Sequence, residues 1–373
     1  MKRHHPNPAR QIESPGALPK AEAFARAREL VLRFGWNATS YQVLNRGIDL
    51  WFSLAGDGVV GFVTHCGYRV VAGAPVCDAG RLTAMTAEFE ADAARHGNRV
   101  CYFGAEQRLQ SLFRDSAQRS MVLLGAQPVW DPAGWSAIVH SRPSLRGQLN
   151  RARNKKVAVE EWEPRRAENN RRLNECLWEW LATKGLPPLH FLVEPDTLGR
   201  LADRRMFVAL HDRAIAGFLV ATPVPARQGW LIEQIVRSRT APNGTAELML
   251  DAAVGAIETT GSRYVTLGLA PLSPRGAVTN GVNPIWLRMV LGWIRVHGRR
   301  FYNFEGLESF KAKFVPDRWD PIYAVTNERR FSPATLHAVA AAFGGGSTTL
   351  LLARALAKAV RTEAAWLAMG RGK

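Results

Sequence analysis

The chain has 373 residues, of which 47% are hydrophobic and 22% charged. This composition excludes an intrinsically disordered protein and allows two domains of ordinary size. Lysine and arginine number 49 against 32 aspartates and glutamates, a formal net charge of +17 that favours an acidic partner such as nucleic acid or anionic lipid.

The N-terminal residues 1–20 are basic and rich in proline but contain no apolar run, so we expect a disordered tail and not a secretory signal. No stretch of about 20 apolar residues occurs, and we expect no membrane-spanning helix. The cysteines lack Cys-x-x-Cys spacing and nearby paired histidines. We therefore expect no metal site and four reduced core thiols, as is common inside the cell: Cys66, Cys77, Cys101 and Cys176.

A first series of predicted elements lies within residues 21–140. Apolar residues at helical spacing predict a helix over 21–34, and three strand-like runs follow within 49–76. A helix over 81–96 and a buried strand over 99–105 complete the series. The order is helix, three strands, helix, strand.

The same order recurs within residues 173–330. The pattern predicts a helix over 171–184, three strands within 206–238, a turn and helix over 241–261, and a strand over 263–271. We therefore expect an α/β (α+β) protein built from two copies of one unit, a duplication visible in the pattern alone.

Residues 141–172 connect the two units and carry ten basic residues against four acidic ones. Their first part, SLRGQLNRARNKK, has no acidic residue, whereas a solvated helix face usually mixes both signs. We interpret the segment as a basic connecting helix that binds a polyanion. The alternative is a solvated basic helix without a specific partner.

The C-terminal segment, residues 331–373, is predicted to be helical after a break at three successive glycines. Arg354, Lys358 and Arg361 form one basic stripe on an otherwise apolar helix. This pattern is typical of an interfacial helix on anionic lipid. A helix packed on the body of the protein, with its stripe in water, fits equally well.

Two motifs are candidates for chemistry. In APNGTAE (241–247) a turn leads from a strand into a helix with Thr245 as the expected N-cap, an arrangement that presents free backbone N–H groups to an anion. In FKAKF (310–314) the flanking phenylalanines bury one helix face, so Lys311 and Lys313 can direct positive charge at an oxyanion or phosphate. The alternatives are an ordinary capped helix and a pair of surface lysines.

These segments resemble a known family. The matching stretches are RPSLRGQLNRARNKKVAVEEW (142–162), APNGTAE (241–247), TLGLAPLS (266–273) and FYNFEGLESFKAKFVPDRWDPIYAV (301–325). They are similar to the C-terminal catalytic domain of aminoacyl-phosphatidylglycerol synthases, of which the lysyl-phosphatidylglycerol synthase is the best-known member. The resemblance spans roughly residues 30–330.

The resemblance implies two tandem GNAT-like acyltransferase domains joined by a basic helix. It implies a transferase that moves an aminoacyl group from charged tRNA to the hydroxyl of a phosphatidylglycerol-type lipid. Because the tRNA ester is already activated, no cofactor or metal is implied beyond the aminoacyl-tRNA co-substrate. The implied location is cytoplasmic, peripheral on the inner face of the cell membrane.

The resemblance and the motifs together suggest roles for individual residues. Lys311 or Lys313 would stabilise the oxyanion or hold a phosphate, Glu233 or Glu247 would bind the α-ammonium, and Arg237 would orient a phosphate or carboxylate. The expected substrate-binding residues are Asn243, Gly244, Thr245, Glu247 and Asn303. The expected tRNA-binding residues, which act through phosphate contacts, are Arg142, Arg146, Asn150, Arg151, Arg153, Lys155 and Lys156.

One departure from the family bears on specificity. Family members commonly carry Asp-Leu-Met-Arg where this chain has Gln234-Ile235-Val236-Arg237, so the arginine is kept and the acid is not. Two other functions stay open at this point. One is a GNAT-type N- or O-acyltransferase that uses acyl-CoA, and the other is a non-catalytic relative that binds RNA or membrane.

Overall fold

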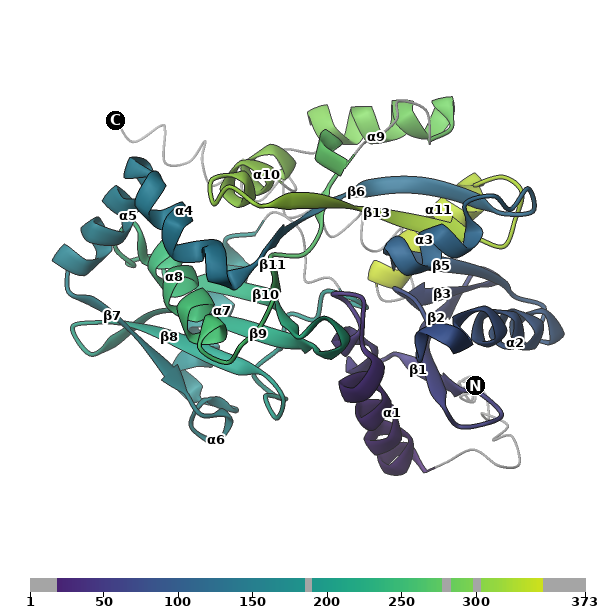
Figure 1. Ribbon diagram of the computed structural model, residues 1–373, viewed down its shortest axis with the longest axis horizontal. Coiled ribbons are helices and arrows are strands. Elements are labelled where there is room, and N and C mark those ends of the chain that lie inside the picture. The colour runs from purple at the N-terminus through teal and green to yellow at the C-terminus, as the bar shows by residue number, and fades with distance from the viewer. Residues whose placement is uncertain (1–18, 185–189, 277–282, 298–302, 345–373) are drawn as a thin grey trace, which may run out of the picture.

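The computed structural model describes residues 19–184, 190–276, 283–297 and 303–344. Within them, thirteen strands form one large mixed sheet in the order β1-β2-β3-β5-β13-β6-β11-β10-β9-β8-β7, with β4 paired to β2 and β12 to β6 (Figure 1). The strands are β1 (Asp49–Phe52), β2 (Gly58–His65), β3 (Tyr68–Ala72), β4 (Val76–Cys77), β5 (Arg99–Ala105), β6 (Ser120–Trp130), β7 (Val157–Trp162), β8 (Arg205–His211), β9 (Ala214–Val224), β10 (Gly229–Arg237), β11 (Tyr264–Thr266), β12 (Ala270–Pro271) and β13 (Arg318–Thr326).

The helices pack outside this sheet. Along the chain they occur before, between and after its strands. They are α1 (Lys20–Phe34), α2 (Leu82–Arg95), α3 (Gln107–Phe113), α4 (Trp135–Ser141), α5 (Pro143–Asn154), α6 (Pro164–Ala167), α7 (Arg171–Ala182), α8 (Thr245–Glu258), α9 (Ile285–His297), α10 (Phe304–Ala312) and α11 (Pro333–Phe343).

The two halves of the sheet repeat one order of elements. In the first half α1 precedes the antiparallel strands β1, β2 and β3, and α2 then connects β3 to its parallel neighbour β5. In the second half α7 precedes the antiparallel strands β8, β9 and β10, and α8 connects β10 to its parallel neighbour β11. The repeat agrees with the duplicated pattern in the sequence. The description of each half as a separate GNAT-like domain stays a prediction.

Two long strands join the halves. Strand β6 pairs with β11 of the second half and with β13, and β13 pairs in turn with β5 of the first half. The segment that contains β13 thus returns from the end of the described chain to the centre of the sheet (Figure 1). We call the junction formed by β6 and β13 the seam between the halves. Candidate residues that are far apart in sequence come close to one another beside this seam.

Successive side chains along a strand point to opposite faces of the sheet, and helices pack against both faces. On β8 and β9, Phe207 and Leu219 face the hydrophobic cluster that includes α8, while Val208 and Phe218 face the cluster that includes Leu173 of α7. The first half is built in the same way, with α1 and α11 in one cluster and α2 and α3 in another. Each half therefore has its own pair of apolar layers.

Several predicted elements are confirmed, and others differ. Strand 99–105 is confirmed as β5 with the expected bounds. The predicted helix over 141–172 is too long, because α5 ends at Asn154 and residues 157–162 form strand β7 at the sheet edge. Strand β13 and helix α9 had no counterpart among the predictions. The predicted C-terminal helix after Gly344 and most of the N-terminal tail lie outside the described residues.

Two further observations concern the cysteines and the membrane. Cys77, Cys101 and Cys176 are buried thiols, but Cys66 is exposed in the turn between β2 and β3, which corrects the expectation of four core thiols. In the part of the chain that the structure describes, no helix has the length and hydrophobicity needed to span a bilayer.

Candidate functional site

The sheet opens at the carboxyl end of β11. Strands β10 and β11 are paired only from Gly229 to Leu231 of β10. Strand β10 continues to Arg237 with a bulge between Ile232 and Gln234, while the chain after β11 turns away to form β12 against β6. Bulges of this kind often lie next to active sites, because they change the direction of neighbouring side chains. The opening lies next to the seam between the two halves.

Lys311 fills this opening from helix α10. Its ammonium group donates to three successive backbone carbonyls, those of Leu267, Gly268 and Leu269, at 2.7, 2.8 and 2.8 Å. The residue is only 5% exposed, and burial lowers the pKa of Lys311 to about 7. Three carbonyl acceptors meanwhile favour the charged amine. All three donors of the ammonium are thus used within the protein.

Lys313, two residues further on, takes a different partner. It forms an ion pair with Glu247 in the first turn of α8, in which Glu247 is buried and Lys313 is partly exposed. Glu247 accepts from Lys313 through Oε1, which leaves Oε2 able to accept from another donor. The pair connects α10 to the N-terminal turn of α8. Two motifs that are 66 residues apart in sequence therefore form one cluster.

The turn that leads into α8 is packed directly against the basic helix α5. Gly244 is the N-cap of α8 with φ of 93°, in the region that favours glycine. A β-carbon added there would collide with the backbone carbonyl of Gln148 on α5. Thr245, predicted as the N-cap, is instead the first helical residue, and its hydroxyl donates to the carbonyl of Pro242 at 2.7 Å.

Asp251, one turn after Glu247, holds α5 from a second point. It accepts from Arg153 at 2.9 Å and from the indole of Trp135 on α4 at 3.1 Å. One acidic face of α8 thus receives a lysine from α10 and an arginine from α5. This arrangement gives Arg153 a structural partner that the sequence did not indicate.

The other predicted tRNA-binding residues lie on or next to α5 and mostly face solvent. Arg146 donates to the carbonyl of His140, and Arg151 donates to Gln148 at 3.4 Å. The side chains of Arg142, Asn150, Lys155 and Lys156 are exposed. Apolar side chains at Leu145, Leu149 and Ala152 fix the inner face of the helix. Helix α5 therefore presents a basic outer face, and the geometry is consistent with phosphate contacts.

The remaining predicted residues lie on the far part of β10, in the turn before α8 and at the start of α10. Glu233 is buried in an ion pair with Arg204, with a nitrogen–oxygen distance of 3.0 Å. Arg237 ends β10 with an exposed side chain. Asn243 is also exposed. Asn303 is the N-cap of α10, and its side chain accepts from the N–H of Gly306 at 2.8 Å.

Gln234, where the resemblance leads us to expect an acid, is held by the loop after α7. Its side-chain oxygen accepts from the hydroxyl of Thr197 at 2.6 Å, and its amide donates to the carbonyl of Pro195 at 3.4 Å. Glu233 lies in the bulge beside it and is turned toward Arg204. The acid adjacent to this position is thus already neutralised by an arginine.

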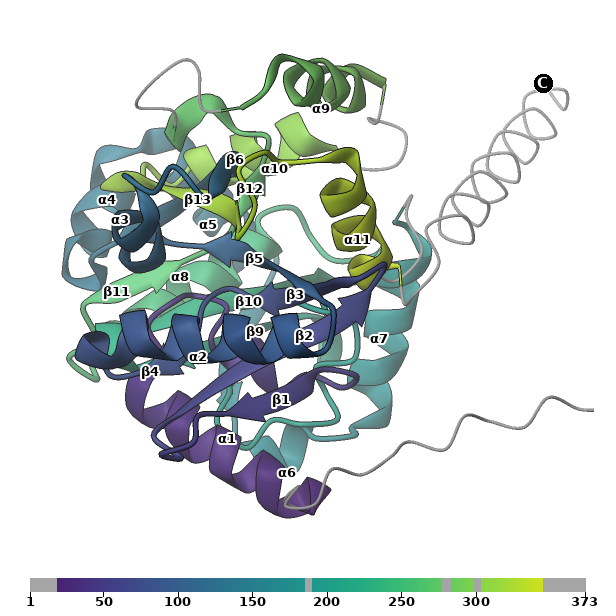
Figure 2. The ribbon, with the colours of Figure 1, turned by 90° about the vertical axis from the view of Figure 1, so that its right-hand side faces the viewer.

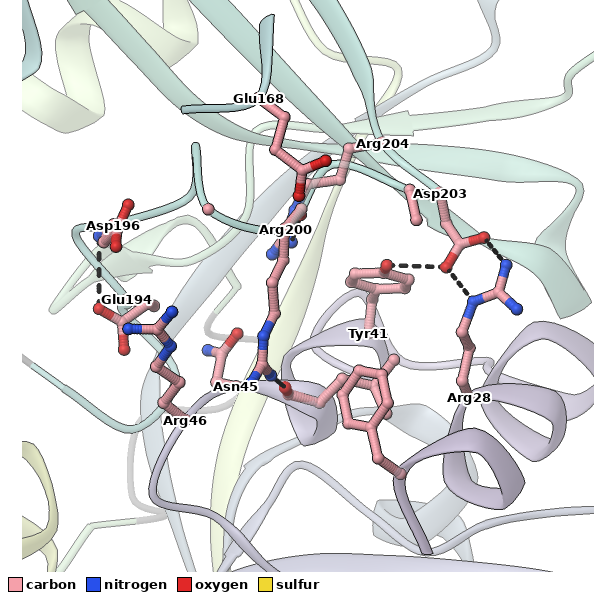
Figure 3. Close-up of a pocket in the computed structure, with 14 residues that line it drawn as sticks. Arg28, Tyr41, Asn45, Arg46, Glu168, Glu194, Asp196, Arg200, Asp203 and Arg204 are labelled. Carbon is pink, nitrogen blue, oxygen red and sulfur yellow. Dashed lines mark hydrogen bonds and ion pairs between the residues drawn. The ribbon is translucent and has the colours of Figure 1, made fainter. Parts of the chain in front are cut away.

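A cavity of about 230 Å³ lies elsewhere, between α1 and the loop over 194–204 (Figure 3). At one end Asp203 accepts from Arg28 at 2.7 Å and from Tyr41 at 2.9 Å. Burial alone would raise the pKa of Asp203, but these hydrogen bonds lower it overall. Since none of the predicted site residues lines this cavity, we regard it as part of the contact between the halves. No sequence motif marked this contact.

The described residues contain no group of three histidine, cysteine, aspartate or glutamate side chains arranged to hold a metal ion. The polar groups that the structure brings together around α10 and the start of α8 are the amines of Lys311 and Lys313, the carboxylate of Glu247 and backbone carbonyl groups. Such groups can bind a charged substrate and stabilise an oxyanion.

Comparisons with known proteins point in one direction. A family model described as phosphatidylglycerol lysyltransferase, C-terminal, matches residues 28–326. The MprF-like domain protein Rv1619 of Mycobacterium tuberculosis is 26% identical over 148 residues, which are 39% of this chain and 31% of that protein. The chain thus aligns with about a third of the length of this curated relative.

Two solved structures share the fold. The C-terminal domain of a putative lysylphosphatidylglycerol synthetase from Agrobacterium fabrum has a TM-score of 0.73 at 22% identity, and covers 88% of this chain and 98% of that one. L-PGS from Bacillus licheniformis has a TM-score of 0.72 at 20% identity, with 89% and 97% covered. At these identities the likeness concerns the fold.

Proposed function

The chain belongs to the phosphatidylglycerol lysyltransferase C-terminal family, and on this premise we propose that it moves an aminoacyl group from charged tRNA to the hydroxyl of a phosphatidylglycerol-type lipid. The observation that carries the proposal is the position of helix α5. This helix has no acidic residue, yet it packs against the turn at Gly244 that opens α8, beside the Lys313–Glu247 pair. A surface suited to a polyanion thus adjoins a site suited to acyl transfer.

The tRNA would lie on the outer face of α5. Exposed cations there, among them Arg142, Lys155 and Lys156, would neutralise backbone phosphates near the acceptor end. Such contacts orient the nucleic acid but carry little sequence information. The amino acid selected would depend on the groups around the ester, not on α5.

The reaction is an ester exchange. The oxygen of the lipid hydroxyl forms a bond to the acyl carbon of the aminoacyl ester, the bond from that carbon to the ribose oxygen breaks, and the proton of the hydroxyl passes to the ribose oxygen. The negative charge that develops on the acyl oxygen needs a nearby cation or N–H donor. Lys313 is our candidate for this role, because the ammonium group of Lys311 already donates all its hydrogen bonds to three backbone carbonyls.

Glu247 is our candidate to bind the α-ammonium of the aminoacyl group. Lys313 donates to one of its carboxylate oxygens, whereas both carboxylate oxygens of Glu233 accept from Arg204. Lys311 would support the site by holding the backbone of residues 267–269 in place at the opening of the sheet. Arg237, exposed at the end of β10, would bind a phosphate of the lipid or the tRNA.

Transfer from acyl-CoA is the competing function. In a GNAT-type enzyme the pyrophosphate of the acyl carrier would approach the first turn of the helix that follows the glycine turn. Here the turn at Gly244 is in contact with α5, and a single glycine replaces a glycine-rich loop. Both features favour the tRNA-dependent reaction.

A donor panel tests the proposal. The purified chain is incubated with phosphatidylglycerol vesicles and, in parallel reactions, with radiolabelled aminoacyl-tRNAs or labelled acetyl-CoA. We expect label in the lipid phase with at least one aminoacyl-tRNA and with no acetyl-CoA sample. Labelled product from acetyl-CoA, with every tRNA inert, would establish the competing function instead.

A further inference from the structure

Helix α9 exposes a row of apolar side chains on its outer face. Ile285 is 75% exposed, Met289 71% and Trp293 64%, and their spacing of four residues places them along one side of the helix. Val290 beside them is 37% exposed. Large apolar side chains are rarely exposed in such a row on a soluble surface, and a contiguous apolar patch marks an interaction site.

The opposite face of α9 anchors the helix to the body. Leu287 is 2% exposed within the core of the first half, and Leu291 and Trp286 pack against the same core. Leu287 and Leu291 are also four residues apart, on the opposite side of the helix. Because these two residues pack inward, the row of Ile285, Met289 and Trp293 faces outward. In both views α9 lies at the outer margin of the molecule (Figure 1, Figure 2).

Helix α9 itself carries no acidic residue, and its Arg295 lies 4.0 and 3.9 Å from carboxylate oxygens of Glu305 and Glu308 on α10. No aspartate or glutamate occurs between Glu258 and Glu305, while α9 carries Arg288 and Arg295. Arg288 is exposed within the outer half of the helix, next to Ile285 and Met289. A helix with large apolar side chains and an exposed arginine on its outer face is suited to the boundary between the headgroups and acyl chains of an anionic bilayer.

Helix α9 also adjoins the candidate site. Arg295 donates to the carbonyl of Leu272 at 3.0 Å and lies 3.9 Å from a carboxylate oxygen of Glu308 on α10, the helix that carries Lys311 and Lys313. A bilayer against α9 would therefore meet the protein next to α10.

We infer that the outer face of α9 is the membrane-docking surface of this protein and that its partner is an anionic phospholipid bilayer. The inference rests on the proposed function in taking the acceptor to be a bilayer lipid. The sequence offered the C-terminal segment as a membrane-binding helix, with a helix packed on the body as the equal alternative, whereas this inference places the contact on α9. Docking through α9 would orient α10 toward the lipid and leave α5 on another part of the surface for the tRNA (Figure 1).

Vesicle binding tests this surface. Full-length wild type, the α9 variant Ile285→Glu/Met289→Glu and the control variant Leu54→Glu/Trp178→Glu are floated with vesicles of phosphatidylglycerol or of phosphatidylcholine. The control removes two exposed apolar residues and adds the same charge on other elements, since Leu54 is 98% and Trp178 57% exposed. We expect the α9 variant to bind phosphatidylglycerol vesicles about tenfold or more weakly, the control to bind within about twofold of wild type, and wild type to prefer phosphatidylglycerol over phosphatidylcholine.

Three results would overturn the inference. Equal losses in both variants would mean a general charge effect, and no loss in the α9 variant would place the contact elsewhere, for example in the C-terminal segment. A dimeric wild type that the α9 substitutions turn into a monomer would mean that a second copy covers the face. Thermal unfolding of all three proteins verifies that the exposed substitutions leave the fold intact.

A soluble acceptor separates this inference from the proposed function. With monomeric short-chain phosphatidylglycerol, the α9 variant should transfer the aminoacyl group at the wild-type rate, because no bilayer has to be reached. Loss of transfer to this acceptor would mean that α9 takes part in the reaction itself, which contradicts a docking role. If wild type transfers to no acceptor while the vesicle result holds, the proposed function fails and the docking surface stands.

Discussion

At the scale of single residues, the Lys313–Glu247 pair carries the proposed chemistry. Exchanging the two residues, as Lys313→Glu/Glu247→Lys, keeps an ion pair but moves the positive charge away from its place on α10. We expect each single substitution to lower transfer about 100-fold, the size of effect seen when one charge-stabilising group is removed. The exchange should recover most of the lost unfolding free energy without recovering transfer.

The transfer rate and the midpoint of urea unfolding are the two measurements for these variants. Recovery of both quantities in the exchanged variant would show that the pair only connects α8 to α10. In that case neither residue could be assigned to the substrate.

The buried amine of Lys311 makes stability depend on pH. Its folded pKa of about 7 lies below the unfolded value of about 10.4, so between these values the unfolded chain binds more protons. The free energy of unfolding must then rise with pH in this window, by up to about 1.4 kcal/mol per pH unit. Urea unfolding of wild type and Lys311→Met from pH 6.5 to 9 should show this rise in wild type alone. Parallel profiles would mean that the three carbonyls keep the amine charged throughout.

Gly244 is where α5 and α8 come closest. Gly244→Ala places a β-carbon against the carbonyl of Gln148 at a positive φ, and we expect a loss of about 2–3 kcal/mol of unfolding free energy. Gly255→Ala on the same helix is the matched control, because no atom beyond its chain neighbours and the adjacent backbone of α8 lies within 4 Å of its added β-carbon. The control should stabilise the protein by about 0.5–1 kcal/mol. Equal unfolding midpoints for the two variants would contradict this contact.

At the scale of elements, the exposed cations of α5 should control tRNA binding. The triple variant Arg142→Glu/Lys155→Glu/Lys156→Glu should weaken binding at least about tenfold and reduce the slope of log affinity against log salt by about 2, since up to three phosphate contacts are lost. Arg153 is left unchanged because it holds Asp251. Filter binding at several salt concentrations measures both quantities.

A charge-matched control accompanies the triple variant. Arg114→Glu/Arg213→Glu/Arg330→Glu makes the same charge change at exposed positions on other elements. An equal loss of affinity in this control would mean that the net charge of +17, and not α5, attracts the tRNA.

Element patterns were readable where the periodicity was strong and local. Helical spacing of apolar residues over 21–34 predicted α1, and the apolar run over 99–105 predicted the buried strand β5. Strand β7 escaped prediction because its exposed face carries glutamates that resemble a solvated helix. Helix α9 escaped because its apolar residues face both inward and outward, so its pattern has no single polar side.

At the scale of the whole molecule, the repeated order of elements was visible in the sequence but the seam was not. Strand β13 returns to the middle of the sheet to pair with β5 and β6, a contact between distant segments that local pattern cannot indicate. The same holds for the candidate site. The sequence marked Lys311 and Lys313, but their partners, the carbonyls of 267–269 and Glu247, follow from the fold.

The transfer of an aminoacyl group from tRNA to phosphatidylglycerol is tested most directly by the mass of the lipid. Vesicles of phosphatidylglycerol are incubated with the purified chain and total charged tRNA. The molecular mass of the extracted lipid is then measured by mass spectrometry. We predict a new lipid species heavier than phosphatidylglycerol by one aminoacyl residue, absent after ribonuclease treatment of the tRNA. Unchanged lipid in vesicles to which the protein is bound, with the tRNA still charged at the end, would contradict this account.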